Sequence, residues 1–512
     1  MAPSPLTAIY DFLSLGNVFL LFISLLMLHY VMVLFEFRNM PPGPRFTTIP
    51  VLGNLLSLDP SAETLSNIFK SLTKNYGPIF SLKMGSYKFV MASSREAVHE
   101  MLVKKSADYA GRPQTYAFYT QTLGGKDIIM GNYGPQWKKQ RKLFTAALRQ
   151  YLLDVPLIER RVATQAEKLV QFMEEQNGKP FNPSDCLMRS VANVICGITF
   201  GEGEDTTNPE LDRLLKLNAD FIANDEDLRL ATILEFFSWA RYFPLKVYYR
   251  VLQPLFEIHD IIRKIFRLRA KEFDPTEPVE NLISGLLRAK YETENEPDDE
   301  MRDVQLSEDH FVITIEDMFV GGYETTSTTL KWVIALLVRY PEHQKDIQRQ
   351  LDEVIGAEKS PSLHDRSSLP LVLATVMETL RIGNLLPIAL PHVTLTDTTL
   401  CGYRVPKDTI VFANTESIHL DPKFWEDPTV FNPYRHLDKD GKLITNQGNF
   451  YPFGAGRRVC AGEALAKVEL FMFVSWMLQK FTFIADEGHP VNTKGAFVQF
   501  PSAYKIRAIK RQ

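Results

Sequence analysis

A glycine-rich stretch near the C-terminus contains the residue with the clearest chemical potential, Cys460. The stretch is Phe453-Gly-Ala-Gly-Arg-Arg-Val-Cys-Ala-Gly462, in which Gly454 and Gly456 permit a tight turn and close approach of the backbone to a flat or bulky group. Helix-forming sequence follows directly, so the thiol lies at a helix N-terminus, where the dipole and Arg458 stabilise a thiolate. A phosphate loop is ruled out because the Gly-Lys-Ser/Thr of that motif is missing.

A second candidate site lies in the helical sequence 311–339, where Gly321 and Gly322 are followed, after one tyrosine, by Glu324 and Thr325. Two adjacent glycines cost about 1 kcal/mol each relative to alanine inside a helix. Close packing of another helix is one explanation. The other is that the missing side chains leave room for a ligand and that local distortion frees the Thr325 hydroxyl from the backbone.

Polar side chains at helical spacing mark two further segments. Trp137 and Arg141 are four residues apart and share one helix face, where their N–H groups could bind a carboxylate. Glu378 and Arg381 share a face in the same way, a pattern that is usually a surface ion pair. His392 precedes strand-like sequence and is either a ligand-binding or a structural histidine.

Composition excludes several classes of protein. The 512 residues carry a formal charge of −4, which argues against a general nucleic-acid binder. With 45% apolar and 23% charged residues, the chain has the composition of an ordinary folded protein. Its four cysteines contain no CxxC pair, so neither a disulfide scaffold nor a cysteine-rich zinc module is expected. Three of these cysteines read as structural: Cys186, Cys196 and Cys401.

The elements that position these residues are mostly helical. Apolar residues recur at intervals of three and four along the following segments: Gln136–Arg149, Val162–Glu175, Phe311–Arg339, Pro341–Ile355, Val372–Ile382 and Glu463–Leu470. Short β-branched and aromatic runs predict strands at Ile79–Met84, Lys88–Met91, Leu390–Thr394 and Thr409–Ala413. The fold class is therefore mainly α with a minor β part. The acidic stretch Tyr291–Asp303 is expected to be a solvated loop between helices.

The N-terminus predicts a membrane anchor. No charged residue occurs from Phe12 to Phe35, a stretch long enough to cross a bilayer. No basic residue precedes Arg38, so the segment is an uncleaved anchor rather than a signal peptide, and the positive residues after it keep the bulk of the protein cytosolic. We predict an anchor at 1–37 (transmembrane about 12–35), a proline-rich spacer at 38–60 and one catalytic domain at 61–512.

The stretch around Cys460 resembles the Phe-Gly-x-Gly-x-Arg-x-Cys-x-Gly loop of the cytochrome P450 heme-thiolate monooxygenases at every fixed position. The resemblance implies the P450 fold, with Cys460 as the axial thiolate of a heme b (iron protoporphyrin IX) and metal ligand. It implies that Arg458, Trp137, Arg141 and His392 bind the heme propionates. It also implies that Phe453, Gly454 and Gly456 shape the heme-binding loop.

The other segments are similar to family motifs as well. Glu324 and Thr325 resemble the acid and threonine that deliver protons to bound oxygen. Glu378, Arg381 and Arg435 resemble a buried charge network that supports the heme loop. Two residues depart from the family pattern: Asn384, where proline is common, and His436, where phenylalanine is common.

The resemblance implies an oxidoreductase that inserts one oxygen atom of O2 into a C–H bond of a lipophilic substrate. Electrons come from NADPH through a separate flavoprotein, NADPH-cytochrome P450 reductase, because the chain has no nicotinamide or flavin segment. The resemblance is also compatible with cytochrome b5 as a second partner. The expected location is the endoplasmic reticulum membrane. No nucleic-acid partner is expected. A basic helix face at Lys138, Lys139 and Lys142 is expected to bind the acidic donor.

Similarity is greatest to the animal microsomal branch, which favours a steroid substrate (17α-hydroxylation, with 17,20-lyase activity as an extension). A xenobiotic or fatty-acid substrate is the alternative, because the pocket-forming stretch 211–244 is only generally apolar, as at Phe221, Ile222, Ile233 and Phe236. A reductase-independent peroxide isomerase would not need Glu324 and Thr325. A non-catalytic heme protein has no use for an oxygen-activating relay.

Overall fold

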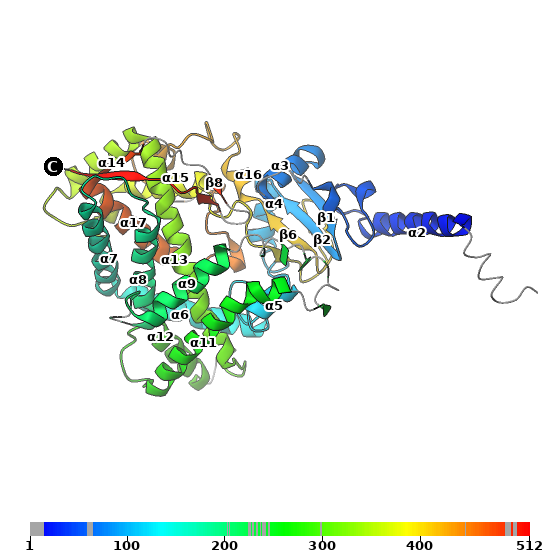
Figure 1. Ribbon diagram of the computed structural model, residues 1–512, viewed down its shortest axis with the longest axis horizontal. Coiled ribbons are helices and arrows are strands. Elements are labelled where there is room, and N and C mark those ends of the chain that lie inside the picture. Colours follow the sequence, from blue (N-terminus) through cyan, green and yellow to red (C-terminus); the bar gives the residue numbers. More distant parts are fainter. Residues whose placement is uncertain are drawn as a thin grey trace, which may run out of the picture.

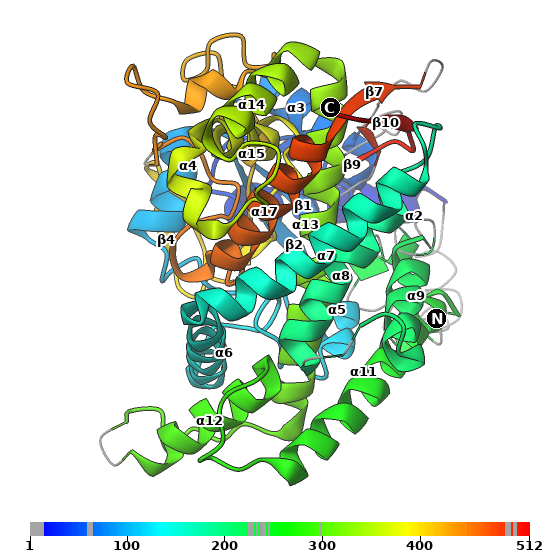
Figure 2. The ribbon, with the colours of Figure 1, turned by 90° about the vertical axis from the view of Figure 1, so that its left-hand side faces the viewer.

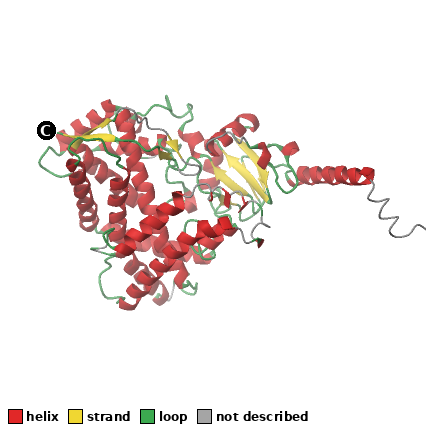
Figure 3. Ribbon diagram, viewed as in Figure 1, coloured by secondary structure: helices red, strands yellow, loops and turns green. Residues whose placement is uncertain are grey.

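The computed structural model describes residues 15–511, apart from 59–64, 202, 204, 224–226, 228–229, 232–233, 236, 238–241, 244–245, 297–298, 446, 487–492 and 495–498. Helices make up most of the described chain, and strands form small sheets beside them (Figure 3), so the predicted class is confirmed. The helices that contribute to the main hydrophobic core include α6 (Pro135–Leu153), α7 (Val155–Glu175), α8 (Ser184–Phe200), α13 (Glu308–Arg339), α15 (Pro370–Ile382) and α17 (Glu463–Lys480). Further helices are α3 (Leu65–Tyr76), α4 (Arg95–His99), α5 (Tyr116–Gln121), α9 (Pro209–Ala223), α11 (Lys246–Glu272), α12 (Leu282–Asn295), α14 (Pro341–Val354) and α16 (Thr415–His419).

The long helix α13 runs through the helical body and packs against α8, α11 and α17 (Figures 1 and 2). Its observed bounds differ from the predicted ones by only three residues at the start, where Ser307 and His310 form a capping box. Its buried face includes Phe319 and Val333, which belong to the main hydrophobic core.

Two helices, α7 and α17, extend seven or more residues beyond their predicted bounds. α7 begins at Val155 because the Asp154 carboxylate accepts the backbone N–H of Leu157 at 3.0 Å and so caps the helix. α17 continues ten residues past Leu470, to Lys480. Those residues are apolar on nearly all sides because they lie in the core, and such a stretch carries no helical periodicity to read.

The largest sheet has the order β1-β2-β6-β3, formed by β1 (Ile79–Met84), β2 (Tyr87–Ala92), β6 (Ile410–Ala413) and β3 (His392–Val393). β1 and β2 form an antiparallel hairpin, and β2 pairs in parallel with β6. The predicted strand Leu390–Thr394 is shorter in the structure because Pro391 has no N–H for a ladder and the carbonyls of 390 and 391 instead accept from Arg112. The smaller pairs are β4 (Thr398–Leu400) with β5 (Tyr403–Val405), β7 (Phe481–Ala485) with β10 (Ile506–Lys510), and β8 (Thr493–Lys494) with β9 (Phe500–Pro501).

The N-terminal helix α2 (Leu15–Glu36) projects away from the body on the side of the largest sheet (Figure 1). Its stretch Gly16–Glu36 is long and apolar enough to cross a membrane, and only 6% of its most apolar window is buried. Residues 12–14 of the predicted span lie outside the described residues. Glu36 at the end of α2 lies 2.5 Å from the Lys83 ammonium on β1.

The proline-rich stretch after α2 packs onto the domain. Arg45 donates to the Ser81 carbonyl at 3.0 Å and to the Ser81 hydroxyl at 2.6 Å, and its guanidinium lies 4.3 Å from the Phe37 ring centroid. Val33 and Phe37 are buried in the core cluster beside β2 and β6. The stretch therefore fixes the direction in which the anchor leaves the domain.

Candidate active site

The loop before Cys460 is a closed turn that depends on glycine. The Cys460 backbone N–H donates to the Phe453 carbonyl at 2.9 Å, and both Gly454 and Gly456 have positive φ, 69° and 67°. A Cβ on Gly456 would lie 1.8 Å from the Leu102 carbonyl oxygen. The close approach expected of this glycine is thus to the protein's own backbone, while Gly454 provides the turn.

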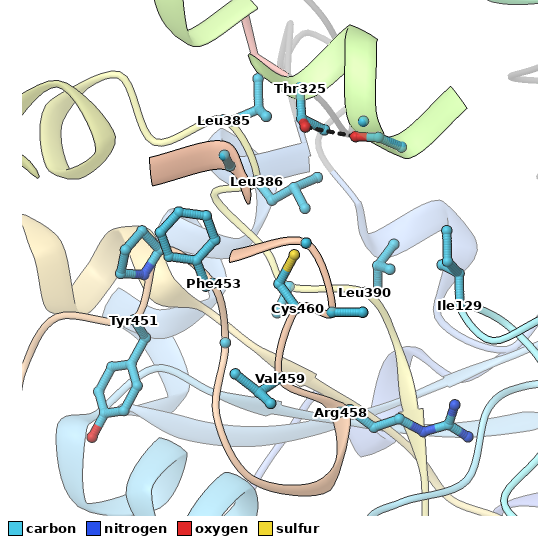
Figure 4. Close-up of a pocket in the computed structure, with 18 of the residues that line it drawn as sticks. Ile129, Thr325, Leu385, Leu386, Leu390, Tyr451, Phe453, Arg458, Val459 and Cys460 are labelled. Atoms are coloured by element: carbon cyan, nitrogen blue, oxygen red, sulfur yellow. Dashed lines mark hydrogen bonds between the residues drawn. The ribbon is translucent and has the colours of Figure 1, made fainter. Parts of the chain in front are cut away.

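The Cys460 side chain points into an internal cavity beneath α13 (Figure 4). Most of the predicted site residues line this cavity together: Phe453, Gly454, Arg458, Cys460, Arg141, His392 and Thr325. Glu324, Trp137 and Gly456 are not among its lining residues. The thiol is exposed to the cavity although it lies deep in the protein. Segments more than 300 residues apart thus meet around one sulfur atom.

Burial raises the pKa of the Cys460 thiol, although the N–H of Gly462 and the charge of Arg141 act in the opposite direction. The protein's own groups therefore do not lower the pKa of this thiol, contrary to what the nearby Arg458 predicts. Arg458 instead donates to the carbonyls of Ala110 and Gly131, at 2.8 and 2.7 Å. The thiolate is the form that binds a metal, so a metal ion bound there would itself have to stabilise the ionised sulfur.

Cationic side chains gather on one side of the cavity, and sequence reasoning missed one of them, Arg112. Burial, together with repulsion from Arg112, lowers the pKa of Arg458 to about 9. Burial lowers the pKa of Arg112 to about 10 and lowers that of Arg141 as well. The nearby carboxylate, Asp127, has a pKa raised by burial to about 6.

This cluster therefore holds more positive than negative charge in a buried place. Uncompensated buried charge is costly, so the cluster fits a ligand that brings carboxylates, as the two propionates of heme do. Arg112 stands between Gly111 and Pro113 in a stretch with no helical or strand period. Only the fold, in which its guanidinium also donates to the Ile129 carbonyl at 2.9 Å, places it at the cavity.

Trp137 and His392 differ in their positions. The Trp137 indole N–H donates to the Ile128 carbonyl at 3.0 Å, and the Arg458 guanidinium stacks 4.1 Å above the indole ring. Trp137 therefore acts on the cavity through Arg458. His392 lies on the cavity wall with Nδ1 at 2.7 Å from the Tyr109 carbonyl. Burial, and then the charge of Arg112, hold the pKa of His392 well below its usual range, so its imidazole is neutral.

The two glycines of α13 are required for different physical reasons. A Cβ on Gly322 would lie 2.8 Å from Ile195 of α8, so this glycine permits close helix packing. A Cβ on Gly321 would have no neighbouring atom nearer than 3.9 Å, although both glycines line the cavity. The packing explanation therefore holds for Gly322, and the explanation of space for a ligand holds for Gly321.

Thr325 faces Cys460 across the cavity (Figure 4). Its hydroxyl donates to the Gly321 carbonyl at 2.7 Å, so here it bonds to the backbone, contrary to the expectation. The oxygen lone pairs of that hydroxyl remain available to accept a proton donor from the cavity. Glu324 points elsewhere, because consecutive helix residues diverge by about 100°. Burial raises the pKa of Glu324, and Lys331 partly offsets the effect.

A buried acid on α17, Glu469, is a second cavity-lining residue that sequence reasoning missed. It is 1% exposed, and its Oε2 accepts from the Thr326 hydroxyl of α13 at 3.2 Å. Its other carboxyl oxygen has no hydrogen-bond partner among the described residues. Burial raises the pKa of Glu469 to about 8. The signal for it was present in the sequence as a lone acid in an apolar helical run.

The charge network predicted around Glu378 is present in the structure. Arg381 forms a bidentate pair with Glu378 at 2.7 and 2.8 Å, and Arg435 reaches the same carboxylate at 3.0 Å. His436 also contacts Glu378, at 2.9 Å. Burial alone would raise the pKa of Glu378, but its bonds with Arg381 and His436 lower it to about 2. Asn384 has φ +35°, which proline cannot adopt.

The basic helix face divides into two parts. Lys138 is exposed and borders a surface groove that is also lined by Arg141, Lys142, Arg149 and Arg457. Lys139 was expected on the outer face, but the structure buries it. Its side chain is 1% exposed, and its ammonium donates to the Val304 carbonyl at 2.7 Å. In the pocket-forming stretch, Phe221 packs against the main core. Ile233 and Phe236 lie outside the described residues, as does the side chain of Ile222.

Comparison with known proteins agrees with this geometry. A family model described as Cytochrome P450 matches residues 41–508. The steroid 17-alpha-hydroxylase/17,20 lyase of Oryzias latipes is 37% identical over 482 residues, which is 92% of each chain. That of Gallus gallus is 35% identical over 90% of each chain, and cytochrome P450 2J5 of Mus musculus is 31% identical over 99% of each.

Solved structures are similar over most of the chain. A zebra fish cytochrome P450 with progesterone superposes with a TM-score of 0.76 and 34% identity, covering 87% of this chain and 99% of that one. A zebra fish cytochrome P450 with abiraterone gives a TM-score of 0.75 and 33% identity, over 88% and 100% of the two chains.

Proposed function

This chain belongs to the cytochrome P450 family and is a monooxygenase of that family, and we propose that its substrates are steroids, hydroxylated at the 17α position. The observation that carries the substrate proposal is the similarity over about nine tenths of the chain to steroid 17-alpha-hydroxylase/17,20 lyases of several vertebrates. The zebra fish structure with progesterone supports it. One oxygen atom of O2 enters the substrate C–H bond and the other leaves as water, with two electrons and two protons consumed.

The residues around the cavity fit heme. Cys460 would ligate the heme iron, and the surplus positive charge of Arg112, Arg141 and Arg458 would bind the propionates. His392, with its Nδ1 already engaged by a carbonyl, would donate to a propionate only in the doubly protonated state that such a carboxylate favours. Heme bound there would supply the activation of dioxygen, which no protein side chain can perform.

The protein itself orients the substrate, excludes water from the cavity and positions a proton donor. Leu385, Leu386 and Leu390 form apolar walls near the sulfur, which exclude water and favour a lipophilic substrate (Figure 4). Gly321 leaves space above Cys460. The Thr325 hydroxyl donates to Gly321 and so presents its lone pairs to a proton donor in the cavity. We propose that this hydroxyl holds a proton-bearing water in place, with Glu324 as a more distant acid on the same helix.

The electron donor would bind at the groove lined by Lys138 and Arg457. Arg457 belongs to the Cys460 loop, and the cations of the groove would complement an acidic flavoprotein, NADPH-cytochrome P450 reductase, or cytochrome b5. The apolar helix α2 supports an anchored location, for which we propose the endoplasmic reticulum membrane with the catalytic domain cytosolic. The domain boundaries at 37 and 60 remain a prediction.

The test uses the full-length protein reconstituted with reductase and NADPH. Pregnenolone or progesterone should shift the heme absorption band and yield a 17α-hydroxylated product. Neither a shift nor a product with these steroids, together with turnover of a fatty acid or a xenobiotic, would favour the second candidate; relatives such as cytochrome P450 2J5 are the reason to include it. Turnover with peroxide but never with reductase would indicate the isomerase class instead.

The ligand assignment has its own test. The reduced protein with carbon monoxide should show the red-shifted Soret band of a thiolate-ligated heme. Cys460→Ala should lose that band even where heme stays bound. Persistence of the band in the variant would refute Cys460 as the ligand.

A further inference from the structure

Helix α6 presents two different rows of polar side chains. Lys138 and Arg141 border the open groove, as does Arg149 about two turns further along the helix. Gln136, Lys139 and Lys142 are spaced three residues apart and so form a separate row on one helix face. The first row is the proposed donor surface. The second row faces a segment of the chain itself.

That segment runs from the last turn of α12 to the start of α13, over residues 292–305, of which 297–298 are not described. α12 lies beside α6 (Figure 2). Residues 291–295 belong to α12, where a solvated loop was expected. The segment contacts each member of the second row in turn.

The contacts are polar and specific. The Gln136 amide donates to the Gln305 carbonyl at 3.3 Å. The Lys139 ammonium donates to the carbonyls of Val304 and Arg302, at 2.7 and 3.3 Å. Lys142 donates to the Asp299 carboxylate. The hydrogen bond from Lys142, and then the backbone N–H of Met301, lower the pKa of Asp299, so this acid is ionised under ordinary conditions.

Lys142 is the residue that connects the two rows. It lines the groove, is half-exposed at 51%, and is at the same time bonded to Asp299, whose side chain is 13% exposed. Glu292, from the same segment, also lines the groove. An acidic protein that approaches the groove therefore meets two carboxylates of this chain already in place.

We propose that the 292–305 segment is a built-in competitor for the electron donor, in which Asp299 holds Lys142 and must release it for full docking. The inference rests on the proposed function, because it assumes that the donor binds at the groove. Its physical basis is exchange of one ion pair for another: the donor gains Lys142 only by breaking a pair that already exists. The segment thereby weakens donor binding at low ionic strength and makes it less sensitive to salt than it would be if Lys142 were unpaired.

The experiment measures the KM for reductase in NADPH-driven turnover. Asp299→Asn removes the charge but keeps an oxygen that can accept the Met301 N–H, which now lies 2.8 Å from the carboxylate. We expect the KM for reductase to fall about two- to fivefold at low ionic strength, the size of effect typical of one exposed ion pair. The difference should vanish near about 0.5 M salt, where exposed charges are screened.

Glu300→Gln is the matched control, because Glu300 is exposed, lies next to Asp299 and loses the same charge. An equal fall in KM for Glu300→Gln would mean general electrostatics and would overturn the proposal, as would an unchanged KM for Asp299→Asn. The steroid-induced spectral shift and the carbon monoxide spectrum should be the same in both variants, which shows that the fold and heme site are intact.

Lys138→Glu distinguishes a wrong donor site from a wrong competitor. Lys138 belongs only to the open groove, where its ammonium lies 5.0 Å from the Tyr133 ring centroid. A raised KM for this variant with an unchanged KM for Asp299→Asn refutes the competitor alone. An unchanged KM for Lys138→Glu refutes the groove as the donor site, and the competitor with it.

Discussion

The Nε2 atom of His436 lies 2.9 Å from the Oε2 atom of Glu378, and both side chains are fully buried. The residue that departs from the family pattern thus joins the charge network that supports the heme loop. Its other ring nitrogen lies 3.0 Å from the Gln447 amide oxygen. His436 therefore connects Glu378 to the loop that leads to Cys460.

Replacing this histidine with the residue common in the family should destabilise this protein. His436→Phe leaves the Glu378 carboxylate with its arginines but removes one buried hydrogen-bond donor, at a cost of about 1–3 kcal/mol. The measurement is the thermal midpoint of the heme-loaded protein. His364→Phe, at an exposed histidine, is the control and should leave the midpoint unchanged. Equal midpoints for wild type and His436→Phe would show that the bond to Glu378 contributes nothing.

Arg112→Gln should weaken heme retention. The variant removes one cation of a buried cluster that carries surplus positive charge, so we expect about tenfold faster loss of heme to an acceptor protein, a cost of about 1.4 kcal/mol. Arg112→Lys should restore part of the retention, because it keeps the charge but not the planar group. Heme loss at the wild-type rate in Arg112→Gln would argue that this arginine serves only its carbonyl partners.

The two glycines of α13 should respond in opposite ways to alanine. Gly322→Ala places a methyl group 2.8 Å from Ile195 and should lower the thermal midpoint. Gly321→Ala meets no close atom, so helix propensity should raise stability by up to about 1 kcal/mol while the methyl group narrows the cavity and weakens substrate binding. The thermal midpoint and the spectral dissociation constant for steroid distinguish these effects. Similar results for the two variants would contradict the assignment.

Glu469 should make stability depend on pH. Its pKa is raised to about 8 in the folded protein from an ordinary value of 4.5, so the folded state binds more protons than the unfolded state between these values. Stability contributed by the neutral acid is complete below about pH 4.5 and is lost as pH rises through 8, with a slope of up to about 1.4 kcal/mol per pH unit.

Glu469→Gln cannot ionise and should flatten that part of the profile. The measurement is the thermal midpoint from pH 6 to pH 9 at a fixed scan rate. Glu463→Gln is the control, since Glu463 lies on the same helix but pairs with Lys467 at 2.5 Å. Parallel profiles for wild type and Glu469→Gln would mean that Glu469 is ionised throughout or that its charge is compensated.

Much of the fold could be predicted from local pattern. The bounds of β1, and those of α13 and α15 to within three residues, follow from local residue pattern and composition. α17 was predicted too short, because a fully buried helix end has no amphipathic side to reveal it.

The sequence by itself determined the chemical centre: Cys460, Arg458, Arg141 and Thr325 were identified from local spacing and family resemblance, and the fold brings them to one cavity. Only the tertiary structure decided which neighbours surround that centre. Arg112 and Glu469 enter through long-range packing, and Lys139 is buried by a segment more than 150 residues away in the chain. The physical reason is that local sequence sets which face a side chain occupies on its own helix. Burial, charge compensation and pKa depend on what the rest of the chain places against that face.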